Sequence, residues 1–154
     1  MKIKFKIVPS SYIILVKNNK ILLSRRLNTG YMDGKYGLVA GHVEKNEGFT
    51  KAIIREANEE AGIILKPNDL KLVYLMNRCE PQNNQKNPGL RERVDVFFTA
   101  KKWQGEIKNL EPNKCDDLSW FPLNKLPKNI IPYIKFVILN FNKNKFYSEF
   151  GYKK

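Results

Sequence analysis

Short hydrophobic runs separated by polar turns predict β-strands in the first part of the chain. Residues 11–16 (SYIILV) and 21–24 (ILLS) are rich in β-branched and bulky residues, and the polar turn KNNK lies between them. This arrangement predicts a hairpin. Charged and bulky residues alternate over 1–7, which also predicts a strand. A loop rich in Gly and Asn is expected over 27–35, and residues 36–39 form another short strand candidate.

A helix is predicted directly after this region, because hydrophobic residues then recur at a spacing of four. From Phe49 onward an apolar residue occupies every fourth position as far as Ala61. Gly48 stands where the N-cap would be, and Gly62 follows the last apolar residue, where glycine commonly ends a helix. We therefore expect one amphipathic helix between these two glycines.

The second half of the chain predicts further strands and a final helix. Strand candidates lie at 70–76 (LKLVYLM), at 94–100 (VDVFFTA) and at 118–121, and a polar loop over 80–89 connects the first two. The apolar run at 132–141 predicts a helix that can cover one face of a sheet. Strands before and after a central helix, with a second helix at the end, indicate an α/β protein: an α/β/α sandwich around a mixed β-sheet.

Length and composition indicate an ordinary globular domain. A chain of 154 residues, of which 42% are hydrophobic, predicts one domain over residues 1–154. No apolar run approaches the ~20 residues of a membrane span, and the N-terminus lacks the apolar block of a signal peptide. Two distant cysteines, Cys79 and Cys115, and one histidine argue against a zinc site or a disulfide framework, so a cytoplasmic location is expected.

The net charge of +13 could attract polyphosphates or nucleic acid. The lysines are dispersed, however, and no run of five basic residues occurs. A dispersed positive charge is sufficient to attract a small anionic substrate. Nucleic acid is therefore not expected as a partner, except as the 5′ end of an RNA.

The most specific pattern in the chain runs from Gly41 to Ile63 and reads G-x5-E-x7-R-E-U-x-E-E-x-G-U, where U is an apolar residue. On the predicted helix, Glu56, Glu59 and Glu60 fall within about 100° of arc beside the apolar stripe. A solvated acidic face is the plain alternative, but it would not require the glycines and the arginine in register. Carboxylates so placed predict a site that holds divalent cations against a phosphate chain.

This pattern is the Nudix box, and over residues 36–63 the chain resembles the Nudix (MutT-type) hydrolases, with weaker similarity across nearly the whole chain. The resemblance implies the Nudix fold and Mg²⁺-dependent hydrolysis of a pyrophosphate bond, with Mn²⁺ as a possible substitute. It implies that the carboxylates of Glu56, Glu59 and Glu60 and the backbone carbonyl of Ala40 bind the metal. At the position of Ala40 the family usually has a second glycine. Glu56 and Glu59 are also implied catalytic residues.

The resemblance further implies roles for three arginines. Arg55 would orient the carboxylates of the motif and would pair with Glu47, which is an implied substrate-binding residue. The alternative is that Arg55 pairs with Glu59 on the protein surface. Arg25 and Arg26 end a predicted strand at a place where similar enzymes contact substrate phosphate. Because side chains alternate along a strand, only one of the two can point inward. Arg26 is the better candidate, and an exposed pair is the alternative.

A late loop offers a further carboxylate, as a second-cation ligand or a water-activating base. Glu111 fits this catalytic role best, with Glu106, Asp116 and Asp117 as rivals and a solvent-facing glutamate as the alternative. His42, next to the motif glycine, is expected to be structural or a loose substrate contact.

The substrate implied by the resemblance is a small nucleotide. Nucleoside triphosphates, ordinary or oxidised, would give a nucleoside monophosphate and pyrophosphate. ADP-ribose or nucleotide sugars and the 5′ end of RNA are alternatives, and a catalytically inactive nucleotide-sensing module is a weaker one. Both a monomer and a homodimer remain open. Three tyrosines could stack on a base, although aromatic residues in a small domain are more often core or rim: they are Tyr31, Tyr36 and Tyr133.

Overall fold

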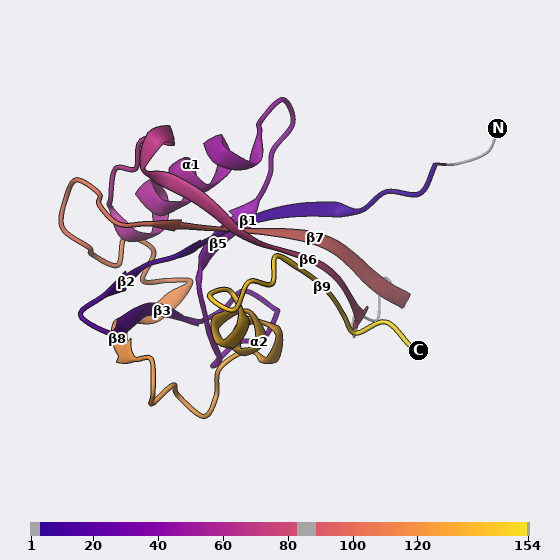
Figure 1. Ribbon diagram of the computed structural model, residues 1–154. Coiled ribbons are helices and arrows are strands. Elements are labelled where there is room, and N and C mark those ends of the chain that lie inside the picture. Colours follow the sequence, from indigo (N-terminus) through magenta and orange to yellow (C-terminus); the bar gives the residue numbers. More distant parts are fainter. Residues whose placement is uncertain (1–3, 83–88, 154) are drawn as a thin grey trace.

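A five-stranded mixed sheet forms the centre of the protein in the computed structural model, which describes residues 4–82 and 89–153 (Figure 1). The strands, in their order across the sheet, are β5 (Val39–His42), β1 (Val8–Ile14), β7 (Gly89–Ala100), β6 (Leu70–Gln82) and β9 (Tyr147–Phe150). Strand β1 pairs in parallel with β7 and antiparallel with β5, while β6 pairs in parallel with β9 and antiparallel with β7.

A smaller four-stranded sheet is built around β3 (Lys20–Arg26). This strand pairs antiparallel with β2 (Val16–Lys17), with β4 (Tyr36–Gly37) and with β8 (Cys115–Pro122). Since β4 and β5 are separated only by Leu38, the chain passes from the smaller sheet to the larger one at this point. The single strand predicted at 36–39 is therefore two strands in two sheets.

Helices α1 (Phe49–Ala61) and α2 (Pro132–Asn140) cover opposite faces of the larger sheet, and a short 3-10 helix, η1 (Pro67–Asp69), follows α1 (Figure 1). Ile13 of β1 belongs to the hydrophobic cluster that contains Ile53 of α1, whereas the next residue, Ile14, belongs to the cluster that contains Val137 of α2. Successive side chains of a strand point to opposite faces, so one strand serves both layers. This confirms the α/β/α sandwich around a mixed sheet.

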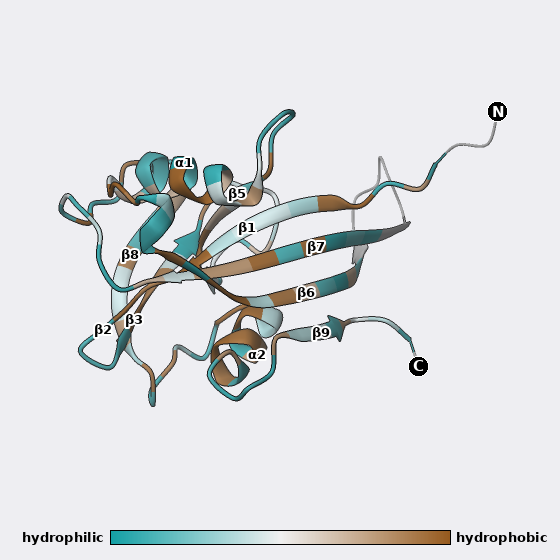
Figure 2. Cartoon of the chain, turned by 45° about the horizontal axis from the view of Figure 1, so that its top comes forward, coloured by the Kyte–Doolittle hydropathy of each residue, from teal (hydrophilic) through white to brown (hydrophobic). Residues whose placement is uncertain are grey.

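The two helices differ in how much polar surface they carry. Figure 2 shows α2 mainly in the hydrophobic colour, whereas hydrophobic and hydrophilic residues alternate along α1. Gly48, in extended conformation, precedes α1, and Gly62 ends it with a left-handed φ of 70°, its N–H donating to the carbonyls of Ala57 and Asn58. The predicted helix and its glycine boundaries are confirmed, and its polar face remains available for a site.

The predicted N-terminal hairpin was wrong in most of its length. Only Val16 and Lys17 pair with β3, whereas the preceding strand inserts between β5 and β7. The hydrophobic run explains this, because a strand in the middle of a sheet is covered on both faces and is apolar throughout. The strand predicted at 1–7 was also wrong over residues 4–7, since the strand begins at Val8; residues 1–3 lie outside the described residues.

The other strands are longer than predicted, or were missed. The loop expected over 80–89 is shorter, because β6 continues to Gln82 and β7 begins at Gly89; residues 83–88 lie outside the described residues. Strand β9 was not predicted, since its four residues contain one buried position and form only an edge. In the described part of the chain, no helix is long and apolar enough to span a membrane.

Candidate active site

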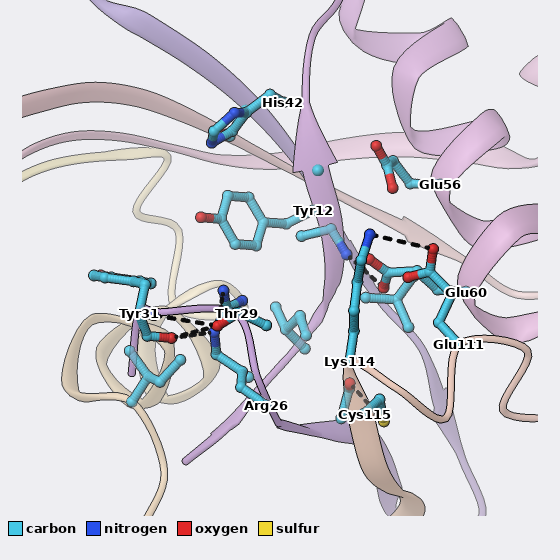
Figure 3. A pocket seen from close by; sticks show the side chains of 18 of the residues that line it. Tyr12, Arg26, Thr29, Tyr31, His42, Glu56, Glu60, Glu111, Lys114 and Cys115 are labelled. Carbon is cyan, nitrogen blue, oxygen red and sulfur yellow. Dashed lines mark hydrogen bonds and ion pairs between the residues drawn. The ribbon is translucent and has the colours of Figure 1, made fainter. Parts of the chain in front are cut away.

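A cavity of about 580 Å³ opens where the two sheets and both helices meet (Figure 3). Sites for small ligands usually have volumes of about 300–1,000 Å³. Helix α1 contributes charged side chains to the lining, and the strands and α2 contribute polar and aromatic ones. The lining residues from α1 are Arg55, Glu56, Glu59 and Glu60. The strongest sequence motif therefore lies on the wall of this cavity.

The acidic side of the cavity comes from one face of α1 and from one loop. Because Ala57 is buried against the sheet, the helical repeat turns Glu56, Glu59 and Glu60 toward the cavity. Glu111, from the loop between β7 and β8, lines the same side (Figure 3). Within residues 4–82 and 89–153, no three acidic, histidine or cysteine side chains are close enough to hold a metal ion as they stand. An ion would have to draw the carboxylates together.

Glu60 shows why a cation fits this acidic side. Its Oε2 accepts a hydrogen bond from the backbone N–H of Ala40 at 3.4 Å. Burial, followed by the charges of Glu56 and Glu111, raises the pKa of Glu60 to about 8. Burial also raises the pKa of Glu56, although Arg55 opposes that rise. Carboxylates that repel one another and resist ionisation form a donor set suited to a hard divalent cation.

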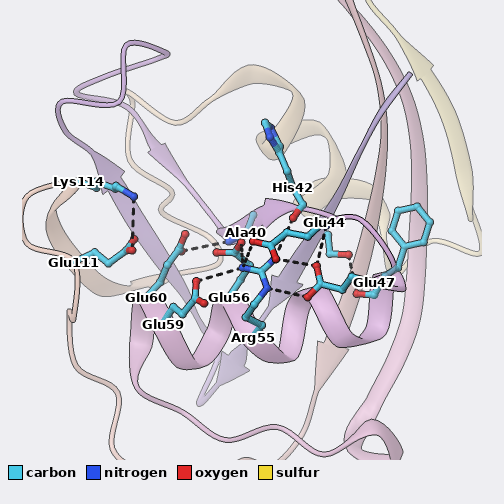
Figure 4. Close-up of polar contacts among 12 residues, drawn as sticks. Ala40, His42, Glu44, Glu47, Arg55, Glu56, Glu59, Glu60, Glu111 and Lys114 are labelled. Atoms are coloured by element: carbon cyan, nitrogen blue, oxygen red, sulfur yellow. Dashed lines mark hydrogen bonds and ion pairs between the residues drawn. The ribbon is translucent and has the colours of Figure 1, made fainter. Parts of the chain in front are cut away.

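Arg55 connects the loop before α1 to the acidic face (Figure 4). Its Nε and Nη2 donate to the two carboxylate oxygens of Glu47 at 2.8 and 3.0 Å, and Nη1 donates to Glu56 at 2.6 Å. The guanidinium holds the pKa of Glu47 down, at about 2. Arg55 also contacts Glu59 at 3.3 Å, so the pairing given as an alternative occurs beside the one with Glu47. Glu47 itself lies behind Arg55, outside the cavity lining.

Gly41 leaves room for one of these carboxylates. A Cβ built on Gly41 would overlap the side chain of Glu56. The glycine of the motif therefore lets strand β5 pass directly against Glu56 of α1. Glycine is required at this position because a side chain would not fit, and not because of an unusual backbone conformation.

The structure separates the two adjacent arginines of β3. Arg26 lines the cavity, where its Nε donates to the carbonyl of Tyr31 at 2.6 Å. Arg25 lies outside the lining: its Nε donates to Asp116 at 2.7 Å, and its guanidinium lies 5.6 Å from the ring centre of Tyr36. Strand alternation allowed one inward arginine, and Arg26 has that place.

Among the four acidic candidates of the late loop, only Glu111 lines the cavity. The backbone N–H groups of Lys114 and Cys115 donate to its carbonyl at 2.9 Å, which folds the loop back toward β8. The side chain of Glu106 is 81% exposed. Asp116 is paired with Arg25. The tertiary structure therefore decides which of the candidate carboxylates reaches the cavity, a choice that the sequence left open.

The tyrosines divide in a similar way. Tyr31 and Tyr133 line the cavity, whereas Tyr36 does not. The Tyr36 ring packs edge-on against Phe121, and its hydroxyl donates to Asp117. Tyr36 therefore packs in the core beneath the site.

The opposite side of the cavity contains basic residues that the sequence motif did not indicate. Arg78 of β6 is 1% exposed, and its Nε donates to Asp95 of β7 at 2.6 Å. Arg93, the partner of Arg78 in the β6–β7 register, lies with one Nη 2.8 Å from Nε2 of His42. Burial, followed by the charge of Arg93, lowers the pKa of His42. One sequence feature could have identified this side: Arg93 and Asp95 alternate in phase with Phe97, which lies in the core.

Comparisons with known proteins agree on the family. The family model described as NUDIX domain matches residues 7–139. An ADP-ribose pyrophosphatase of Methanocaldococcus jannaschii is 32% identical over 124 residues, which cover 80% of this chain and 67% of that protein. A NAD-capped RNA hydrolase NudC of Pseudomonas putida KT2440 is 27% identical over 122 residues, but these cover only 39% of its length.

Solved structures share the fold. The MutT Nudix hydrolase from Burkholderia pseudomallei superposes with a TM-score of 0.73 at 24% identity, covering 88% of this chain and 98% of that one. A MutT protein from Bacillus halodurans gives a TM-score of 0.72 at 18% identity, covering 93% and 88%. Nudix proteins typically depend on a divalent metal and bind nucleotide substrates. With the family model matching most of its length, and with the arginine and three of the four glutamates of the motif on the wall of its cavity, the chain belongs to the Nudix family of pyrophosphohydrolases.

Proposed function

We propose that this protein hydrolyses nucleoside triphosphates, ordinary or oxidised, to a nucleoside monophosphate and pyrophosphate with Mg²⁺ as cofactor. The observation that carries the proposal is the shared cavity: the acidic face of α1, Glu111, Arg26 and three tyrosines line one space of about 580 Å³. Such a space accommodates a base and a phosphate chain together.

The metal would be held by the carboxylates of Glu56, Glu59 and Glu60 and by the backbone carbonyl of Ala40. A bound Mg²⁺, or Mn²⁺ in its place, would neutralise phosphate charge and make a bound water more acidic. The carboxylates support this assignment because burial, followed by the charges of Glu56 and Glu111, raises the pKa of Glu60.

The remaining residues have roles that follow from their positions. Arg55 holds Glu56 in place through a hydrogen bond of 2.6 Å and acts on the reaction through that carboxylate. Glu111 would accept the proton of the attacking water or bind a second cation. Arg26 would bind a phosphate oxygen, since a guanidinium remains charged and donates in a planar fork. Tyr31 and Tyr133 line the cavity and would contact the base.

Hydrolysis of ADP-ribose is the second candidate, because the relative that is 32% identical carries that name. Action on an RNA 5′ end is a third, supported by the net charge of +13 and by the similarity to the NAD-capped RNA hydrolases. The three motif glutamates of α1 on the cavity wall argue against a purely nucleotide-sensing role.

The test is a substrate panel with Mg²⁺: the four ribonucleoside and four deoxyribonucleoside triphosphates, 8-oxo-dGTP, ADP-ribose, dinucleoside polyphosphates and triphosphorylated RNA. We expect a nucleoside monophosphate and pyrophosphate from at least one triphosphate, resolved by ion-exchange chromatography. The Glu59→Gln variant is the control for a contaminating enzyme, and should lose at least ~100-fold in kcat. Cleavage of ADP-ribose or RNA alone would overturn the triphosphate assignment.

A further inference from the structure

Arg93 is a buried cation on the cavity wall, and the acidic residue whose charge acts on it, Asp95, is bound by Arg78. It is 8% exposed and lines the cavity from β7. Among the residues that the structure describes, no carboxylate oxygen lies within 4.0 Å of its guanidinium, although most of the other arginines have such a partner. Burying a charge without a partner costs folding free energy, so the buried position of Arg93 requires a physical explanation.

The nearby carboxylates already bind another arginine. Arg78, opposite Arg93 in the β6–β7 register, contacts Asp95 and Glu80 at 2.6 Å each. With Arg26 on the same cavity, this side carries three guanidinium groups against two carboxylates. Both carboxylates contact Arg78, so among the described residues neither Arg26 nor Arg93 has a carboxylate within 4.0 Å. Of these two arginines, Arg93 is the buried one.

His42 orients Arg93 and does not neutralise it. The Nη1 of Arg93 lies 2.8 Å from Nε2 of His42. Because a guanidinium has only donors, the imidazole nitrogen must be the acceptor in this contact. Among the described residues the Arg93 guanidinium forms no second hydrogen bond, so its other N–H groups can donate to a ligand. In Figure 3, His42 and Tyr12 stand across the cavity from Glu60 and Glu111.

We propose that Arg93, oriented by His42, binds a phosphate oxyanion of the substrate that is separate from the pyrophosphate group held by the glutamates of α1. This inference rests on the proposed function, since it assigns a second group of the same substrate. Two sources have the required chemistry: the terminal phosphate of a nucleoside triphosphate, or a phosphate monoester on the ribose of a dinucleotide. Either one accepts two hydrogen bonds from a guanidinium fork.

The first test uses metal-free protein and inorganic phosphate, so that it does not depend on catalysis. Melting temperature and titration calorimetry compare wild type, Arg93→Gln and Arg25→Gln, a matched change outside the cavity. Without phosphate, Arg93→Gln should melt at or above wild type, because an unbalanced buried charge is removed. Phosphate should stabilise wild type and Arg25→Gln, whereas the affinity of Arg93→Gln should fall at least ~10-fold.

Two results of this test would overturn the proposal. The first is a lower melting temperature of Arg93→Gln without phosphate, which would make Arg93 a structural partner of Asp95. The second is an unchanged affinity for phosphate in that variant. Should Arg93→Gln not fold, Arg93→Lys keeps the charge without the fork, and it should retain the fold with weakened phosphate binding; wild-type affinity in Arg93→Lys would again reject the role.

The second test separates the two phosphate sources with Mg²⁺ present. The kcat/KM ratio of ATP to ADP reports a terminal phosphate, and the ratio of NADPH to NADH reports a ribose phosphate. We expect Arg93→Gln to reduce one of these ratios at least ~10-fold, through KM. Unchanged ratios for both pairs would reject the inference. If no nucleotide is hydrolysed, the proposed function fails, and the phosphate titration still decides whether Arg93 is an anion site.

Discussion

The two oxygens of Glu47 accept two hydrogen bonds from one guanidinium, that of Arg55, at 2.8 and 3.0 Å. The side chain of Glu47 is 6% exposed and that of Arg55 is 23% exposed, so the pair is partly shielded from solvent. It fixes the loop before α1 to the middle of that helix. The remaining nitrogen of Arg55 holds Glu56 at 2.6 Å, which means that the pair sets the position of a carboxylate on the cavity wall.

Replacing Arg55 by lysine should keep the charge but lose the fork. We expect kcat to fall about 10–100-fold, as when partners of metal ligands are removed, while KM for the nucleotide stays within a few-fold. The Mg²⁺ concentration for half-maximal activity should rise, and the circular dichroism spectrum should not change. An unaltered Mg²⁺ dependence together with wild-type kcat would show that Arg55 does not position Glu56.

Glu60 should make the stability of the metal-free protein depend on pH. Its pKa is raised from an ordinary value of 4.5 to about 8, so the folded protein keeps a proton that the unfolded chain has lost. The unfolded state then binds fewer protons, and the free energy of unfolding falls as pH rises from about 4.5 to about 8.

Urea denaturation in EDTA at pH 5 and pH 8 measures this effect. Glu60→Gln should be the more stable protein at pH 8, and Mg²⁺ should stabilise wild type there more than the variant. Equal pH dependence in the two proteins would mean that the raised pKa of Glu60 is not the cause.

Glu111 and Glu106 form a matched pair in the loop between β7 and β8. Glu111 lines the cavity, whereas the Glu106 side chain is 81% exposed. Glu111→Gln should lower kcat by about ten- to a thousandfold with KM within a few-fold, as expected for loss of a base or second-cation ligand. Glu106→Gln should do little. Steady-state kinetics would reverse the assignment if Glu106→Gln were the more damaging change.

Arg26 and Arg25 form a second matched pair, adjacent on β3. Arg26→Gln should raise KM for the nucleotide at least ~10-fold, because a charged donor to phosphate is lost from the cavity. Arg25→Gln breaks an exposed ion pair with Asp116 and a contact with the Tyr36 ring, both outside the cavity, so KM and the free energy of unfolding should change little. The same increase in KM for both variants would point to the overall charge of the protein and not to a contact at Arg26.

The sequence by itself determined the features that depend on neighbours along the chain. Helix α1 was bounded by Gly48 and Gly62, and the helical repeat alone placed Glu56, Glu59 and Glu60 on one face. The order of strands and helices likewise gave the fold class.

Only the tertiary structure decided which of several similar side chains reach the cavity. Arg26 and Glu111 were distinguished from Arg25 and Glu106 by the pairing of β3 with β8 and by the folding of the late loop. Helical geometry follows from local hydrogen bonds, so the sequence reveals it directly. Arg93 meets His42 only because β7 and β5 both pair with β1, and such register is set by packing between residues distant in sequence, which no local pattern encodes.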